Sequence, residues 1–281
     1  MKKILIPTDF SATAINAVKY ALELFKYDKS EITILHTYAD EVYENTTNKP
    51  RDVFQDYKNR VKHNVDKKLK NEIEEMLELS PNPRHKYNYK SQFGSLIDVI
   101  DEFVNEHNID VIVMGTKGQT NNPFLTFGSN AIKVMKYSQC PVLVVPNTFH
   151  DLHPENILFP TDYLIPYKRR ELKLLSSLAV SFVSNIDVLY VSKSKKITHR
   201  QEDNQQFLQE SFTSNKVNFL QVHDDNVTET INKTINEQAI DLLVMVNQRH
   251  SYLENLLYHS TIEKIGLTIK IPFLVFQNLN R

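Results

Sequence analysis

This chain of 281 residues has one cysteine and only five glycines, and it has almost no excess of either charge sign. Its one cysteine, Cys140, excludes an intramolecular disulfide and any metal site built from several cysteines. Lys and Arg number 33 and Asp and Glu number 34, a balance that argues against nucleic acid and anionic membranes as partners. No apolar run approaches the roughly 20 residues of a membrane span, and Asp9 interrupts the N-terminal apolar stretch before a signal peptide can form. We therefore expect a soluble, cytoplasmic protein of about two domains.

The chain contains an internal repeat. Three segments recur in the same order: residues 3–10 as 156–163, residues 109–114 as 240–245, and residues 140–145 as 271–276. The offset falls from 153 residues at the first segment to 131 at the other two, so the second half has lost about 22 residues in between. We predict two homologous domains, residues 1–147 and 154–281, joined by a short linker that breaks the periodicity.

Each half alternates short apolar strands with amphipathic helices. In the first half the predicted strands are residues 4–7, 32–37, 87–92, 111–114 and 142–145, and the predicted helices are residues 11–25, 52–79, 96–106 and 129–137. This alternation is typical of βαβ units with a parallel sheet. The predicted fold class is therefore α/β, with two tandem, open, parallel five-stranded sheets and helices on both faces. Ligands of such sheets bind at the carboxyl ends of the strands.

Three of the five glycines lie in one segment, and they flank a predicted loop. Gly115 follows a predicted strand, Gly118 comes three residues later, and Gly128 precedes a predicted helix. Glycine permits a positive φ and a close approach of the backbone, and the amide groups at a helix start favour a phosphate. Ser129 adds a hydroxyl donor and Lys117 a positive charge. The pattern indicates either a phosphate-binding loop or a loop whose glycines serve only as turns, and it matches neither the Walker A nor the dinucleotide motif.

Pro-Thr-Asp-Phe-Ser at residues 7–11, His36 with Thr37, and the G-x2-G-x9-G-S-N pattern at residues 115–130 resemble the universal stress protein (UspA-like) family. The likeness covers both halves, so the chain resembles a tandem member. It implies sheets of strand order 3-2-1-4-5, similar to the adenine-nucleotide alpha-hydrolase-like fold, and a stress-response function. The glycine pattern resembles that of the subgroup that binds ATP, and Mg²⁺ could accompany the phosphates.

The resemblance also implies roles for individual residues. Asp9 would lie near the adenine and ribose, and the backbone at Thr37 would meet the adenine. The remaining matched positions are the strand end, Met114 and Gly115, and the phosphate cradle, Gly118, Gly128, Ser129 and Asn130. Thr37 and Asn130 depart from the apolar residues common there. Asp9 is also a candidate to close an Asx turn before the first helix, and both roles could coexist. Tyrosines after the second strand, Tyr38, Tyr43 and Tyr57, either roof the adenine pocket or only pack.

The second half has lost these glycines. At the offset of 131, Gly115, Gly118 and Gly128 become Val246, Arg249 and His259, whereas Ser129 is kept as Ser260 and Asp9 corresponds to Asp162. Side chains at these positions resist positive φ and block a close backbone approach. We expect this half not to bind phosphate; the alternative is that Arg249 and His259 bind another anion.

The last predicted strands, residues 142–145 and 273–276, would be edge strands, and unpaired edges favour pairing. Members of the family commonly dimerise through this strand in antiparallel fashion. We therefore predict that the two halves pair with each other as an intramolecular pseudo-dimer. A homodimer of the whole chain stays open, and protein partners are unknown.

Three functions remain open: a nucleotide-dependent regulator or interaction module, a slow ATPase or nucleotidyl-transfer enzyme, and a scaffold with a vestigial site. No paired carboxylate or general base accompanies the loop, so we rank catalysis second and name no catalytic residue. Cys140 is expected to be a small buried residue. His150, His153 and Glu155 lie in the linker, on no regular element, and no metal is predicted there.

Overall fold

The computed structural model describes residues 1–116, 127–147, 153–164, 167–194, 196–247 and 270–278. The first half contains β1 (Lys2–Pro7), α1 (Ala12–Leu24), β2 (Ser30–Thr37), α2 (Ala39–Thr46), α3 (Arg51–Leu79), β3 (His85–Gln92), α4 (Leu96–His107), β4 (Val111–Gly115), α5 (Ser129–Tyr137) and β5 (Val142–Val145). The second half contains β6 (Asn156–Pro160), α6 (Arg169–Phe182), β7 (Asn185–Val191), α7 (His199–Ser211), β8 (Lys216–Val222), α8 (Val227–Glu237), β9 (Leu242–Asn247) and β10 (Phe273–Gln277).

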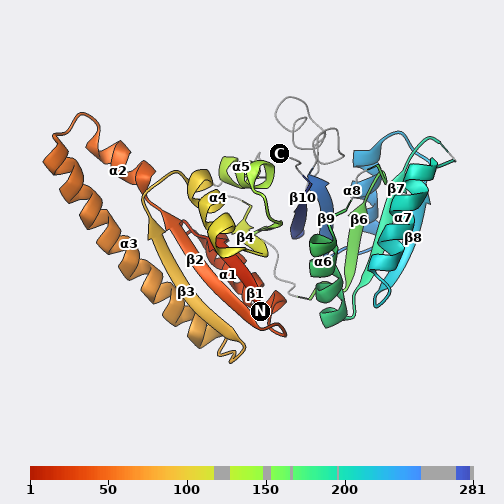
Figure 1. The fold of residues 1–281 in the computed structure, drawn as a ribbon, viewed down its shortest axis with the longest axis horizontal. Coiled ribbons are helices and arrows are strands. Elements are labelled where there is room, and N and C mark those ends of the chain that lie inside the picture. Colours follow the sequence, from red (N-terminus) through yellow and green to blue (C-terminus); the bar gives the residue numbers. More distant parts are fainter. Residues whose placement is uncertain (117–126, 148–152, 165–166, 195, 248–269, 279–281) are drawn as a thin grey trace.

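The strands form one ten-stranded sheet with helices on both faces (Figure 1). Its order is β3-β2-β1-β4-β5-β10-β9-β6-β7-β8, so each half contributes strands in the order 3-2-1-4-5. Strand pairs within each half are parallel. The predicted α/β fold class and the duplicated topology are confirmed.

The two halves join through β5 and β10, which pair in antiparallel fashion with Leu143 opposite Leu274. Both strands are buried along their whole length. This pairing is the predicted one, and it follows from the cost of leaving an apolar edge strand unpaired. The outer edges of the combined sheet are β3 and β8.

Two hydrophobic layers cover the sheet, one on each face. Successive side chains of a strand point to opposite faces, so Ile4 and Ile6 of β1 join the layer beneath α1 and α3, and Leu5 joins the layer beneath α4 and α5. Because both faces are covered, the central strands are continuous apolar runs. Local signals also set the helix starts: Ser11 caps α1 by accepting a hydrogen bond from the backbone N–H of Ala14 at 3.2 Å.

The residues missing from the second half lie between its second and third strands. Ile32 pairs with Tyr87 in the first half and Ile186 with Val217 in the second, so the repeat offset falls from 154 to 130 across this connection. A single helix, α7, stands where the first half has α2 and the long α3, which extend beyond the sheet (Figure 1). Within the described residues, no helix is both long and apolar enough to cross a membrane.

Candidate functional site

The carboxyl ends of β1, β2 and β4 bring the predicted site residues of the first half to one edge of the sheet. The three strands are parallel, with β1 between the other two. Asp9 follows β1, Thr37 ends β2, and Met114 and Gly115 end β4. The chain connections reverse direction between β1 and β4, which is where open α/β sheets bind their ligands.

Helix α5 starts at the same edge. The N–H of Gly128, its N-cap residue, donates to the carbonyl oxygen of Thr116 at 2.7 Å, so the chain leaves β4 and begins α5 at one point. Gly128 has no side chain to cap the first turn, and Ser129 and Asn130 are exposed. The amide groups and the positive end of the dipole at this turn therefore suit an external anion. The intervening residues 117–126, with Lys117 and Gly118, lie outside the described residues.

Gly115 is required for packing against α1. A Cβ atom at this position would lie 2.6 Å from Cγ2 of Thr13 and 3.0 Å from its carbonyl carbon and oxygen. None of the described glycines has a positive φ, and Gly128 has a φ of -72°. Gly115 and Gly128 therefore do not adopt the positive φ that glycine permits. The close approach at Gly115 is to the protein's own helix.

The carboxylate of Asp9 closes the turn between β1 and α1. Its Oδ1 accepts a hydrogen bond from the N–H of Ser11 at 3.0 Å. In the second half Oδ1 of Asp162 accepts from the N–H of Leu164 at 2.8 Å, which is the same Asx turn. Because the half that lacks the three loop glycines also keeps this turn, the shared aspartate has a structural role in both halves.

The residues on either side of this aspartate repeat as well. Oγ1 of Thr8 accepts from the N–H of Phe10 at 3.1 Å, and Oγ1 of Thr161 accepts from the N–H of Tyr163 at 3.0 Å. Phe10 and Tyr163 both have a left-handed backbone, with φ of 61° and 56°. Such a conformation is uncommon for a bulky residue and persists only where the surroundings determine it. The turn is therefore an inherited element of the scaffold that both halves share.

A buried carboxyl group on α3 lies near this turn. Glu72 is 8% exposed, and neither of its carboxyl oxygens has a hydrogen-bond partner of normal geometry among the described residues. Burial raises the pKa of Glu72 to about 7, with the negative charges of Glu75 and Asp9 adding to the rise and the hydroxyl of Thr8 opposing it. The sequence predicts only that Glu72 lies in the helix of residues 52–79 and gives no reason to single it out.

His36, the residue before Thr37, supports the same turn. Its Nδ1 is 2.7 Å from the carbonyl oxygen of Thr8, and its ring centroid is 4.8 Å from that of Phe10. Since a carbonyl oxygen only accepts, Nδ1 carries the proton. Burial lowers the pKa of His36, and the hydrogen bond to Thr8 opposes that shift. The ring thus connects the end of β2 to the turn after β1.

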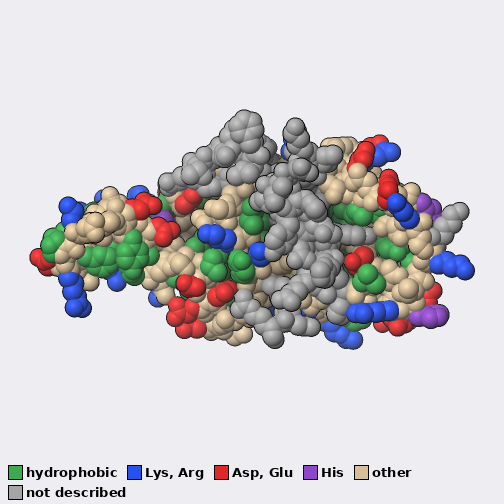
Figure 2. All heavy atoms as spheres, turned by 90° about the horizontal axis from the view of Figure 1, so that it is seen from above, with side chains coloured by type: hydrophobic (Ala, Val, Ile, Leu, Met, Phe, Trp, Pro, Cys, Tyr) green, Lys and Arg blue, Asp and Glu red, His purple; other side chains and the backbone are tan. Residues whose placement is uncertain are grey.

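Aromatic side chains gather beyond the ends of β2 and β3. The ring centroid of Phe93 is 5.7 Å from that of Tyr38 and 5.5 Å from that of Tyr43, and Nζ of Lys58 lies 3.9 Å from it. Figure 2 shows hydrophobic side chains over the end of the molecule that α2 and α3 form, where Tyr43 is 56% exposed. Tyr38 and Tyr43 therefore pack within an aromatic cluster of their own.

The corresponding edge of the second half is built differently. Val246, at the position of Gly115, is 7% exposed. Asn247 and Gln277, at the ends of β9 and β10, turn their side-chain amides toward α5 of the first half. Arg249, His259 and Ser260 lie outside the described residues.

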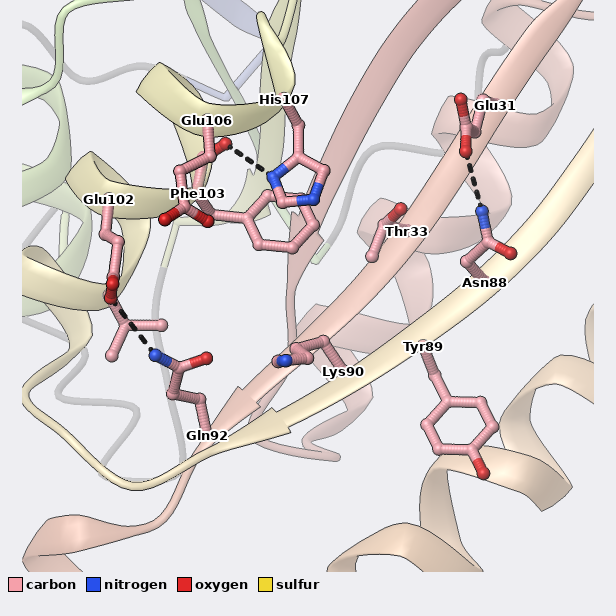
Figure 3. Close-up of a pocket in the computed structure, with 11 residues that line it drawn as sticks. Glu31, Thr33, Asn88, Tyr89, Lys90, Gln92, Glu102, Phe103, Glu106 and His107 are labelled. Carbon is pink, nitrogen blue, oxygen red and sulfur yellow. Dashed lines mark hydrogen bonds between the residues drawn. The ribbon is translucent and has the colours of Figure 1, made fainter.

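A cavity of about 390 Å³ lies elsewhere, between α4 and the outer strands β2 and β3 (Figure 3). None of the predicted site residues lines it. Lys90 points into it, Glu102 accepts from Gln92 at 3.1 Å, and Phe103 stacks on His107. Its lining carries both charge signs, with Lys90 and the carboxylates Glu31, Glu102 and Glu106.

The structure also shows the surroundings of Cys140, a candidate reactive residue, and of His153, a candidate metal ligand. Cys140 is buried, as predicted, and burial raises the pKa of its thiol to about 12. Nε2 of His153 is 3.1 Å from Oε1 of Glu23. Within the described residues, no three His, Cys, Asp or Glu side chains converge to hold a metal ion.

The fold and this edge define a class: α/β proteins with two copies of a 3-2-1-4-5 unit, the first with glycines between its fourth strand and the following helix. The family model described as "Universal stress protein family" matches residues 1–146 and again residues 155–277. The chain belongs to this family, with the domain present twice.

Individual relatives agree with this assignment. Universal stress protein MJ0577 of Methanocaldococcus jannaschii is 32% identical over 157 residues, which cover 51% of this chain and 94% of that protein. Universal stress protein MJ0531 of the same organism is 30% identical over 148 residues, covering 51% and 81%. The crystal structure of a universal stress protein from Archaeoglobus fulgidus matches 98% of this chain and 96% of that one, with a TM-score of 0.66. At 16% identity, that structure shows a shared fold alone.

Proposed function

We propose that the first half binds ATP at the carboxyl ends of β1 and β4, and that the chain acts in the stress response as a nucleotide-dependent regulator or interaction module. The observation that carries the proposal is the start of α5. Its first turn has no side-chain cap and exposed residues, and it lies at the edge where Asp9 follows β1. Unpaired amide groups at a helix start are well suited to phosphate oxygens.

Particular groups would hold each part of the nucleotide. The first-turn amides at Ser129 and Asn130 would bind phosphate oxygens, with Lys117 and the backbone at Gly118 beside them. The carboxylate of Asp9, which closes the turn through Oδ1, would also accept from a ribose hydroxyl. The backbone at Thr37 would meet the adenine. Bound Mg²⁺ would neutralise part of the phosphate charge.

The second half is proposed not to bind a nucleotide. The three loop glycines are replaced there by Val246, Arg249 and His259, and side chains at these positions would block a close backbone approach. The chain should therefore bind one ATP.

Nucleotide binding can be tested directly. Mass spectrometry of denatured, purified protein should detect a co-purified adenine nucleotide, and titration calorimetry with Mg-ATP should give one site per chain. Gly118→Val should abolish binding while the circular dichroism spectrum is unchanged; unchanged affinity in a folded variant would refute the proposal. Incubation with labelled ATP tests the competing hypothesis of a slow ATPase.

The duplication supplies a matched control for Asp9. Asp9→Ala and Asp162→Ala each remove the same turn hydrogen bond, so each should cost about 0.5–1.5 kcal/mol of stability. Only Asp9→Ala should weaken ATP binding. Equal ATP affinities in the two variants would assign the aspartate to the turn alone.

A further inference from the structure

Helix α5 ends against the second half. The last carbonyl groups of a helix have no partner within the helix. Here the carbonyl oxygen of Met135 accepts from Nδ2 of Asn247 and from Nε2 of Gln277, both at 2.9 Å. Nδ2 of Asn247 is also 3.3 Å from the carbonyl oxygen of Lys136. Asn247 and Gln277, the amide clamp, thus cap α5 from residues more than a hundred positions away in the chain.

The amide clamp is buried and held in place. Asn247 is 7% and Gln277 is 0% exposed. Nδ2 of Asn247 donates to Oε1 of Gln277 at 2.9 Å, and the backbone N–H of Gln277 donates to the carboxylate of Glu171 at 3.0 Å. A shift of the end of α5 would leave these buried amide groups without acceptors. Because an unsatisfied buried donor is strongly unfavourable, the contacts oppose such a shift.

Only the second half has amide side chains at the two clamp positions. At the offset of 131, Asn247 corresponds to Thr116 and Gln277 to Pro146, so the first half has no side-chain amide at either position. Pro146 instead accepts, through its carbonyl oxygen, from Nδ2 of Asn16 at 2.9 Å. The half that has lost the glycines is therefore the half that carries the clamp.

The two ends of α5 are close together. The helix has nine residues, which at 1.5 Å per residue span roughly 14 Å. One end is clamped, and the other is the proposed phosphate-binding turn at Gly128. A short helix moves as a unit, so a shift of its last turn displaces the amide groups of its first turn.

We propose that Asn247 and Gln277 are positioning residues for the phosphate site. By holding the end of α5 they set the place of its first-turn amides, and the second half thereby raises the ATP affinity of the first without binding a nucleotide itself. This inference rests on the proposed function. The second half would then contribute to ATP binding through a contact that an isolated first half lacks.

The test compares two ligands on the full chain. Gln277→Met and Asn247→Leu remove the donors at similar side-chain volume. We expect each variant to bind ATP about tenfold more weakly, because one well-placed hydrogen bond to the phosphate-binding turn is weakened. Adenosine, which has no phosphate, should bind as it does to the unaltered chain.

Gln201→Met is the matched control. Gln201 is 7% exposed, and its Nε2 donates to the carbonyl oxygen of Asp162 at 2.8 Å, remote from α5. This variant loses that buried hydrogen bond and also the capping box that Oε1 of Gln201 makes with Thr198 at the start of α7, so it disturbs the second half away from α5 and should bind both ligands normally. Hydrogen exchange without ligand should be faster in the last turn of α5 for the clamp variants and unchanged for the control.

The outcomes separate the two proposals. Absence of ATP binding to the unaltered chain overturns the proposed function and, with it, the role of the clamp. ATP binding that is unaffected in folded clamp variants, or an equal loss for ATP and adenosine, overturns the clamp proposal alone. If both variants fail to fold, Asn247→Thr, which installs the residue of the first half, should still give the selective loss for ATP.

Discussion

Replacing Glu72 by Gln tests whether the fold retains a buried carboxyl group at a cost in stability. Glu72 is 8% exposed, and its carboxyl oxygens have no hydrogen-bond partner of normal geometry among the described residues. Its pKa is raised from 4.5 to about 7, first by burial and then by the charges of Glu75 and Asp9. Gln has nearly the same shape and carries no charge at any pH.

The direction in which stability changes with pH follows from proton binding. Between pH 4.5 and about 7 the folded chain keeps the proton on Glu72 and the unfolded chain has lost it, so stability falls as pH rises through this window. At about 1.4 kcal/mol per pH unit the loss approaches roughly 3 kcal/mol above pH 7. A buried Gln amide without partners offsets part of that gain. We expect Glu72→Gln to stabilise the chain by about 1–2 kcal/mol at pH 8 and, because the cost of the buried amide does not depend on pH, to destabilise it by about 1 kcal/mol at pH 4.5.

Urea denaturation followed by circular dichroism at several pH values between 4.5 and 8 measures the effect. Glu74→Gln, on the same helix and exposed, is the control and should change stability little. The reasoning is refuted if Glu72→Gln has the same pH dependence as the unaltered chain, or is less stable than it at pH 8.

Three further changes test other parts of the structure. Gly115→Ala should lower stability by about 1–3 kcal/mol, because the new Cβ would lie 2.6 Å from Cγ2 of Thr13; thermal unfolding at an unchanged temperature would contradict this. Leu274→Ala removes a side chain that is 1% exposed at the junction with β5 and should cost about 2–5 kcal/mol, with hydrogen exchange accelerating in both β5 and β10. The thiol of Cys140, with its pKa raised to about 12, should resist Ellman's reagent at pH 8 until the chain is unfolded; rapid labelling of the native protein would show that it is accessible.

The amino-acid sequence alone determined the duplication, the fold class and most element positions. Buried parallel strands must be apolar on both faces, so segments such as residues 111–114 and 142–145 stand out as short apolar runs. Helix α5 was predicted with the bounds that the structure gives it, because Gly128 precedes it and apolar residues recur at helical spacing. The sequence analysis does not predict helix α2, because this helix has only eight residues, is mostly polar, and packs against α3 through contacts such as that between Tyr43 and Phe54.

Long-range contacts, by contrast, were decided only by the tertiary structure. Sequence spacing identified Gly115 as special, but packing showed that Thr13 is the neighbour that excludes a side chain. Asn247 and Gln277 are ordinary polar residues at strand ends until the join between β5 and β10 brings them to the carbonyl groups of α5. Periodicity reports which face of an element is buried, whereas a hydrogen bond between distant residues depends on how whole elements are placed, and no local pattern encodes that placement.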